Sequence, residues 1–384
     1  MAFNKLAAAL TDALVTLEPN KLEAHELVMI LGAAIGGKPS PKAIPLLSSI
    51  DETPELCDLY GRMLHLPGTS SRVLDRSTIA LWLLRSTTTK GAAATIRDLE
   101  LFLGSQDIVL RQVFSIEGLN LTKEVSLDAK TYLLPWEQLP ESTGKGKARL
   151  LAMDQLRPLS AALIREIVVP KKFLRPDEIV GVPPALLPSD YSDIVMCASL
   201  FGPSGAAIAS VWWEAPAWIP PEGTSISYSI ERAKPQNANW PDEAYDSFPR
   251  LYRCFRNLTA DEQARFRVPL QRLNSAMRRW DPVDSAIDSG IAIESLFQSG
   301  SSHVFLLRAA RYLDVDPVER KKTKTKLLLQ NKARNRAVHD GKVPKTIDGV
   351  AIDKILSVGF DLLAKSIIRM IENGAPVWED FDLS

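Results

Sequence analysis

The sequence is poor in the residues that build disulfide frameworks and metal sites, with 3 cysteines and 4 histidines among 384 residues. Cys57, Cys197 and Cys254 lie far apart and form no Cys-x-x-Cys pair. This pattern is typical of free thiols in a reducing cytoplasm. The histidines and carboxylates show no metal-ligand spacing either. We therefore predict a cytoplasmic protein that uses no metal and no other cofactor.

Long apolar runs and net charge are also absent. The longest apolar run, residues 27–37, is shorter than the about 20 residues that a membrane-spanning helix needs. Lys5 and Asp12 lie within a helical pattern at the N-terminus, which argues against a signal peptide. The 46 Lys and Arg residues balance 46 Asp and Glu residues. Overall charge therefore indicates neither a nucleic-acid nor a membrane partner.

The overall balance hides one basic segment. Residues 308–345 carry twelve Lys or Arg residues against four acidic ones, a surplus of eight positive charges. Such a segment attracts phosphate-bearing partners. A solvated helix face is an equally good interpretation of any single lysine in it.

Apolar periodicity and the positions of Pro and Gly predict an α+β fold that is predominantly α, in three regions. Residues 1–105 are expected to form a helical N-terminal domain, with helices over 54–66, 72–86 and 92–103 among others. Residues 106–235 are expected to form a mixed domain with short β-strands. Residues 241–384 are expected to form a helical bundle.

The mixed region is expected to combine strands with one helix. The expected strands cover residues 109–116, 124–127, 131–134, 194–198, 206–213 and 225–230. A helix is expected over 148–167, kinked or split at Pro158. The preceding residues, 142–147, read as a flexible loop whose Gly-Lys pair lacks the spacing of a phosphate-binding loop. Four tryptophans in this part of the chain could stack bases, but we favour a core role for them: Trp212, Trp213, Trp218 and Trp240.

The last region shows helical periodicity with clear start signals. The expected helices cover residues 241–257 with a break at Pro249, 259–280, 281–298, 303–313, 317–339 and 352–371. Thr259, followed by Asp261 and Glu262, is typical of a helix N-terminus.

The long basic helix ends in a group of residues suited to phosphate chemistry. Arg334 is followed by Asn335 and, four residues further on, by His339. Four residues advance about 400° around a helix, so Asn335 and His339 share one face, flanked by Arg334. Arginine binds phosphate in a bidentate manner, and an imidazole exchanges protons near neutral pH. The pattern is short and is also a common coincidence.

Glu294 interrupts an apolar stripe in an earlier helix. It follows Ile287 and Ile291 at helical spacing. A buried carboxylate needs a cation, for which Arg334 or Arg308 are candidates. The alternative, a bundle edge where Glu294 reaches water, is equally good.

Three pieces of sequence in a fixed order resemble the HEPN superfamily, specifically its Apea-like branch. The first piece, 278–297, contains Ile291-Ala292-Ile293-Glu294, and the second covers residues 305–313. The third is the Arg-polar-x3-His motif of residues 334–339, placed before a glycine turn and a final apolar helix. The resemblance covers about residues 248–373, a third of the chain. It departs at Asp340, where many members have glycine.

The resemblance implies a metal-independent endoribonuclease that works as a homodimer, in phage defence or in abortive-infection or toxin-type growth arrest. It assigns catalytic roles to Arg334, Asn335 and His339, and more loosely a supporting role to Glu294. RNA is the implied partner, and a protein that inhibits or triggers the enzyme remains open. One histidine cannot act as base and acid at once, which favours two copies at one site. The basic residues that would hold the RNA backbone are Arg320, Lys321, Lys322, Lys324, Lys326 and Arg336.

A non-catalytic interpretation competes with this one. The same bundle could serve as a dimerisation module that binds RNA or nucleotides, with Arg334 and His339 used for binding or for helix capping.

Overall fold

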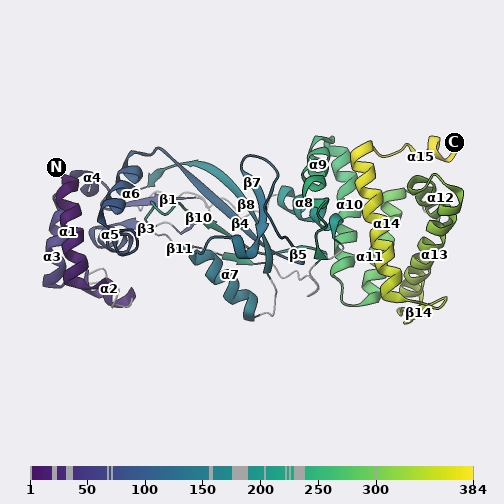
Figure 1. Cartoon of the computed structure of the whole chain (residues 1–384), viewed down its shortest axis with the longest axis horizontal. Coiled ribbons are helices and arrows are strands. Elements are labelled where there is room, and N and C mark those ends of the chain that lie inside the picture. The colour runs from purple at the N-terminus through teal and green to yellow at the C-terminus, as the bar shows by residue number, and fades with distance from the viewer. Residues whose placement is uncertain are drawn as a thin grey trace. The chain divides into compact units, whose positions relative to one another are not determined.

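The computed structural model describes residues 2–19, 24–31, 38–66, 69–70, 72–154, 159–174, 189–202, 205–220, 223–224, 226–228, 238–298 and 301–383. The predicted α+β fold, predominantly α, is confirmed (Figure 1). None of the helices in this described part combines the length and apolar character that crossing a bilayer requires.

The chain divides into two compact units, which we describe separately. Unit 1 comprises Met1–Gln112, Glu166–Ala185 and Trp212–Ser225, and unit 2 comprises Val113–Arg165, Leu186–Val211 and Ile226–Ser384. Each unit has its own apolar core. This grouping follows contacts rather than chain order, so the three consecutive domains expected above stay a prediction.

Unit 1 is built mainly from helices. Their bounds are α1 (Ala2–Leu17), α2 (Ala24–Ile30), α3 (Ile44–Asp51), α4 (Pro54–Cys57), α5 (Arg76–Lys90) and α6 (Ala92–Gly104). A small sheet has the order β3 (Arg72–Leu74), β1 (Arg62–His65), β9 (Lys172–Leu174). The helix expected over 54–66 is therefore wrong beyond Cys57, and the helix expected over 72–86 begins only at Arg76. The reason is that β1 pairs with β9, about a hundred residues away in the sequence, which no local pattern reveals.

The largest sheet has six strands. Their order is β12 (Ile226–Tyr228), β10 (Ala207–Glu214), β4 (Asp107–Glu117), β8 (Leu159–Pro170), β7 (Thr131–Pro135) and β6 (Val125–Ser126). The neighbours β7 and β8 are antiparallel, with Leu133 opposite Leu163. The predicted strands near 109–116, 124–127, 131–134 and 206–213 are confirmed. Of the strand expected over 225–230, residues 226–228 are confirmed, and residues 225, 229 and 230 lie outside the described part.

Three predictions in the mixed region are wrong. Residues 159–167 are strand β8 rather than helix, because an unbroken run of buried residues from Ser160 to Ile164 suits a central strand as well as a helix. Residues 194–198 belong to helix α8 (Ser189–Ala198) rather than to a strand. Four buried apolar residues of α8 have the helical spacing i, i+3, i+4, i+7: Tyr191, Ile194, Val195 and Ala198.

The expected loop at 142–147 is also helical from its second residue, since α7 covers Thr143–Asp154. Lys145 is buried in this helix, where it donates to the carbonyl oxygen of Leu139 and pairs with Glu141 at 2.9 Å. This lysine is therefore a structural residue and offers no phosphate-binding group. The predicted core role of the tryptophans is confirmed for Trp212 and Trp240, which are 1% and 5% exposed.

Unit 2 contains the bundle. Its helices are α9 (Ala244–Asn257), α10 (Ala260–Arg278), α11 (Pro282–Phe297), α12 (Ser302–Leu313), α13 (Pro317–Asp340), α14 (Ile352–Asn373) and α15 (Trp378–Leu383). Helices α10, α11, α13 and α14 lie side by side (Figure 1). The predicted helices are confirmed, but the break expected at Pro249 is wrong. Helix α9 continues through it, held by the buried side chains of Phe248, Leu251 and Phe255.

Helix ends in the bundle match their sequence signals. Thr259 and Glu262 form a capping box at the start of α10. Asp281 and Asp316 cap α11 and α13, each followed by a proline at the first helical position. Gly341 ends α13 with a φ of +59°, a conformation that glycine adopts without strain.

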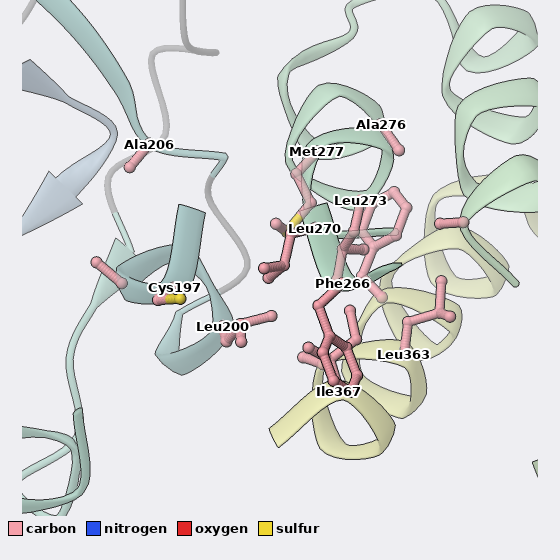
Figure 2. Close-up of a cluster of buried hydrophobic side chains, with 14 of the residues drawn as sticks. Cys197, Leu200, Ala206, Phe266, Leu270, Leu273, Ala276, Met277, Leu363 and Ile367 are labelled. Carbon is pink, nitrogen blue, oxygen red and sulfur yellow. The ribbon is translucent and has the colours of Figure 1, made fainter. Parts of the chain in front are cut away.

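The core of unit 2 joins α8 to the bundle. Figure 2 shows one cluster in which side chains of α8, α10 and α14 gather, among them Cys197, Leu270 and Ile367. Burial raises the pKa of the Cys197 thiol, so this cysteine stays protonated and unreactive.

The last helix, α15, is fastened to α12 by an arginine. Arg308 donates three hydrogen bonds to the carboxylate of Asp382, the shortest at 2.7 Å. It donates two more to the carbonyl oxygens of Phe297 and Gln298. The Arg308 guanidinium also lies 5.3 Å from the ring centre of Trp378, which is buried.

This attachment predicts a pH dependence. The hydrogen bonds from Arg308 lower the pKa of Asp382. A carboxyl group whose pKa is lower in the folded chain than in the unfolded chain stabilises the fold at pH values above the unfolded pKa of about 3.9. This stabilisation is lost as the pH falls through the folded pKa. We expect Asp382→Asn to lower the urea midpoint at pH 7 and to have a smaller effect at about pH 3, below the unfolded pKa. Asp380→Asn, in the same helix, is the control. Equal effects of Asp382→Asn at both pH values would contradict the prediction.

Candidate functional site

Helix α13 places Arg334 on the side that faces the bundle. One stripe of this helix has the spacing i, i+4, i+7, i+11 and i+14: Thr323, Leu327, Gln330, Arg334 and Ala337. All of these except Arg334 are buried, and Arg334 is partly buried. An arginine on a buried stripe needs a partner across the helix interface.

That partner is Glu294 on α11. Nη2 of Arg334 lies 3.0 Å from Oε1 of Glu294, and the two side chains are 26% and 36% exposed. Nη1 of Arg334 donates to Oδ1 of Asn335 at 3.3 Å. A pair with this exposure contributes up to about 1 kcal/mol to stability, so its geometry matters more than its energy.

Of the two cations predicted for Glu294, Arg334 is therefore confirmed and Arg308 is wrong, because Arg308 is bound to Asp382. The alternative that Glu294 reaches water also holds in part. Ile287 and Ile291 on the same stripe are only partly buried, because α11 packs mainly through neighbouring positions. Those buried positions include Ala286, Ser289, Gly290, Ile293 and Leu296.

Gly290 on α11 makes room for the stem of Arg334. A Cβ atom at position 290 would lie 2.4 Å from Cγ of Arg334 and 3.2 Å from its Cβ. A similar close approach occurs between α14 and α13, where a Cβ at Gly359 would lie 2.3 Å from Cδ of Gln330. Sequence reasoning missed Gly290. The available signal was a glycine inside a helix, which costs about 1 kcal/mol relative to alanine and so points to a packing role.

We expect Gly290→Ala to destabilise unit 2 by about 1–3 kcal/mol, the usual cost of overpacking, despite the better helix propensity of alanine. Combining it with Arg334→Ala removes the overlapping Cγ atom and should recover most of that loss. Urea unfolding of the four chains of this double-mutant cycle measures the coupling. Gly359→Ala, whose overlap is with Gln330, is the matched control and should not be rescued by Arg334→Ala. Additive effects of Gly290→Ala and Arg334→Ala would contradict the proposed contact.

His339 lies apart from this cluster. It is exposed in the last turn of α13, and the described part of the chain gives it no hydrogen bond or ion pair. Five residues separate it from Arg334, so the two side chains leave the helix about 140° apart and about 7.5 Å apart along its axis. The structure thus brings together Arg334, Asn335 and Glu294, and leaves His339 facing solvent on the same helix as Asn335.

The predicted RNA-binding residues fall into two groups. Three have partners close in the chain: Arg320 donates to the carbonyl oxygen of Asp314 at 2.7 Å, Lys322 pairs with Glu319 at 2.6 Å, and Arg336 pairs with Asp340 at 2.9 Å. The other three have no ion pair among the described residues: Lys321, Lys324 and Lys326. Arg320 is partly buried in the turn between α12 and α13, so it also has a structural task.

Comparison of the whole chain with protein-family models, with curated proteins and with solved structures found no match.

Proposed function

We propose that the bundle of unit 2 is a metal-independent endoribonuclease that works as a homodimer in the cytoplasm. The observation that supports this proposal best is the arrangement of two side chains on helix α13. Arg334 is partly exposed and is held in place by Glu294 and Asn335, and an exposed histidine, His339, follows about one and a half turns later. The three unpaired cysteines support the cytoplasmic setting.

The residue types suit cleavage through the ribose 2′-hydroxyl. The 2′ oxygen forms a bond to phosphorus while the bond from phosphorus to the 5′ oxygen breaks, leaving a 2′,3′-cyclic phosphate and a 5′-hydroxyl. His339 accepts the proton of the 2′-hydroxyl, and an imidazolium donates a proton to the 5′ oxygen. Arg334 stabilises the charge that develops on the phosphate. Glu294 and Asn335 orient the guanidinium.

A second copy of the chain completes this arrangement. Arg334 and His339 of one chain diverge by about 140° around the helix axis, and one imidazole cannot act as base and acid in the same step. A two-fold axis near the exposed face of α13 would supply a second histidine and a second arginine. Lys321, Lys324 and Lys326, which lie earlier on the same helix, are available for the RNA backbone. Phage defence or growth arrest would be the biological setting.

The test is incubation of the purified chain with RNA in EDTA, followed by analysis of the product ends and by light scattering of the protein. We expect cleavage that EDTA does not inhibit, 2′,3′-cyclic phosphate ends, and the mass of a dimer. Cleavage that requires a divalent metal would refute the mechanism. RNA binding without cleavage would favour the non-catalytic module.

A further inference from the structure

A cavity of about 300 Å³ opens in unit 2, away from the Arg334 cluster. It is lined by residues of β7 and β8 and of helices α8 and α9, together with the residues that follow β6. Its charged and aromatic lining consists of Arg165, Arg253, Arg256, Tyr191, Tyr252, Asp128 and Asp190. The function proposed above uses none of these residues.

Among the described residues, two of the three guanidinium groups in this cavity have no carboxylate partner. Arg256 is paired with Asp190 at 2.7 Å. Arg165 instead donates to the hydroxyl oxygen of Tyr191 at 3.0 Å, with its guanidinium 5.5 Å from the ring centre. Arg253 is exposed, and the described residues provide it with no ion pair or hydrogen bond. The cavity therefore has more cationic donors than the described residues satisfy.

The remaining polar groups are also suited to an anion. Burial raises the pKa of Tyr252 and of Tyr191, so both hydroxyls remain protonated and able to donate at neutral pH. The other carboxylate of the lining, Asp128, accepts a hydrogen bond of 2.7 Å from the backbone N–H of Lys130. This bond holds the Asp128 side chain within the turn that Asp128 and Lys130 form. The formal charge of the lining, three arginines against two aspartates, is +1.

The volume of the cavity favours a ligand larger than a bare ion. About 300 Å³ is roughly ten times the share of one water molecule in the liquid and lies at the lower end of small-molecule sites. Leu127 and Ile194 add apolar surface to the lining. The cavity is thus large enough for an organic group attached to the anion.

We propose that this cavity binds a small molecule that carries a phosphate monoester, with Arg253 and Arg165 as the principal phosphate ligands. Guanidinium groups match the oxygens of a phosphate in bidentate geometry. The organic part of the ligand lies against the apolar side of the cavity. This proposal does not depend on RNA cleavage.

The test is isothermal titration of the full chain with four probes: AMP, ribose 5-phosphate, inorganic phosphate and adenosine. We expect saturable binding of at least one of the two phosphate esters, tighter than that of inorganic phosphate, and no binding of adenosine. The ester that binds more tightly identifies the organic group. Adenosine binding as tight as AMP binding, or no binding of either ester at millimolar concentration, would overturn the proposal.

Two variants on one helix make the test specific. Arg253→Ala should weaken binding of the phosphate ester about tenfold or more, because a charge-assisted hydrogen bond is lost. Arg250→Ala is the matched control, since Arg250 lies one turn earlier on α9 and pairs with Glu372 at 2.9 Å, outside the cavity lining. Equal weakening by both variants would show an unspecific charge effect and would overturn the site.

Discussion

We expect His339→Ala to lower the rate of RNA cleavage by about 10²- to 10⁴-fold, the usual contribution of a general acid–base group. His339 is exposed and has no partner among the described residues, so its removal should leave the fold unchanged. The loss therefore measures chemistry rather than stability. Rates are compared in EDTA with a labelled RNA, and circular dichroism checks the fold of each variant.

His303→Ala is the control for this prediction. His303 is also an exposed histidine of the bundle, in the first turn of α12. The variant His303→Ala should leave the rate of RNA cleavage unchanged. Arg334→Ala, by contrast, should lower that rate as His339→Ala does. Full activity of His339→Ala would show that the cleavage comes from another site or from a contaminating nuclease.

The second large effect is expected at Phe248, where alanine should destabilise unit 2 by about 3–5 kcal/mol. The Phe248 side chain is fully buried, and its ring centre lies 5.1 Å from that of Trp240 and 6.1 Å from that of Phe201. Removal of the ring leaves a cavity that these rigid neighbours cannot fill. Hydrogen exchange of peptides from α9 and α10 measures the change in the free energy of opening.

Val268→Ala is the matched control for Phe248→Ala. Val268 lies on α10 and is 46% exposed, so its truncation should change stability by no more than about 0.5 kcal/mol. Peptides from α5 in unit 1, which has a separate core, should show unchanged exchange in both variants. A loss below about 1 kcal/mol for Phe248→Ala would contradict the close packing of Phe248 against Trp240 and Phe201.

The bundle could be predicted because its signals are local. Thr259, Asp281 and Asp316 cap their helices through groups within three residues, and Gly341 ends α13 through its own backbone. The buried side chains of each long helix repeat at helical spacing. Each of these features acts over a single turn, so the order of residues is sufficient to show it.

The mixed region was less predictable because pairing partners lie far apart in the chain. Residues 159–167 of strand β8 are helical by the sequence prediction, but their pairing with β7, where Leu163 lies opposite Leu133, makes them a strand. The run 194–198 was expected to be a strand, and what makes it helical is the burial of Tyr191 with Ile194 and Ala198 on one face. Short apolar runs fit both structures, and tertiary contacts decide between them.

The candidate site shows the same division. The sequence by itself determined that Arg334 and Asn335 are neighbours on a long basic helix, and it left open whether Glu294 pairs with a cation or reaches water. Only the tertiary structure decided that Arg334, and not Arg308, meets Glu294, and that Gly290 makes the space for it. It also brought Arg165 to the same cavity as Arg253, nearly ninety residues later in the chain. The physical reason is that spacing along one helix follows from its 3.6-residue repeat, whereas contacts between elements depend on how their surfaces pack.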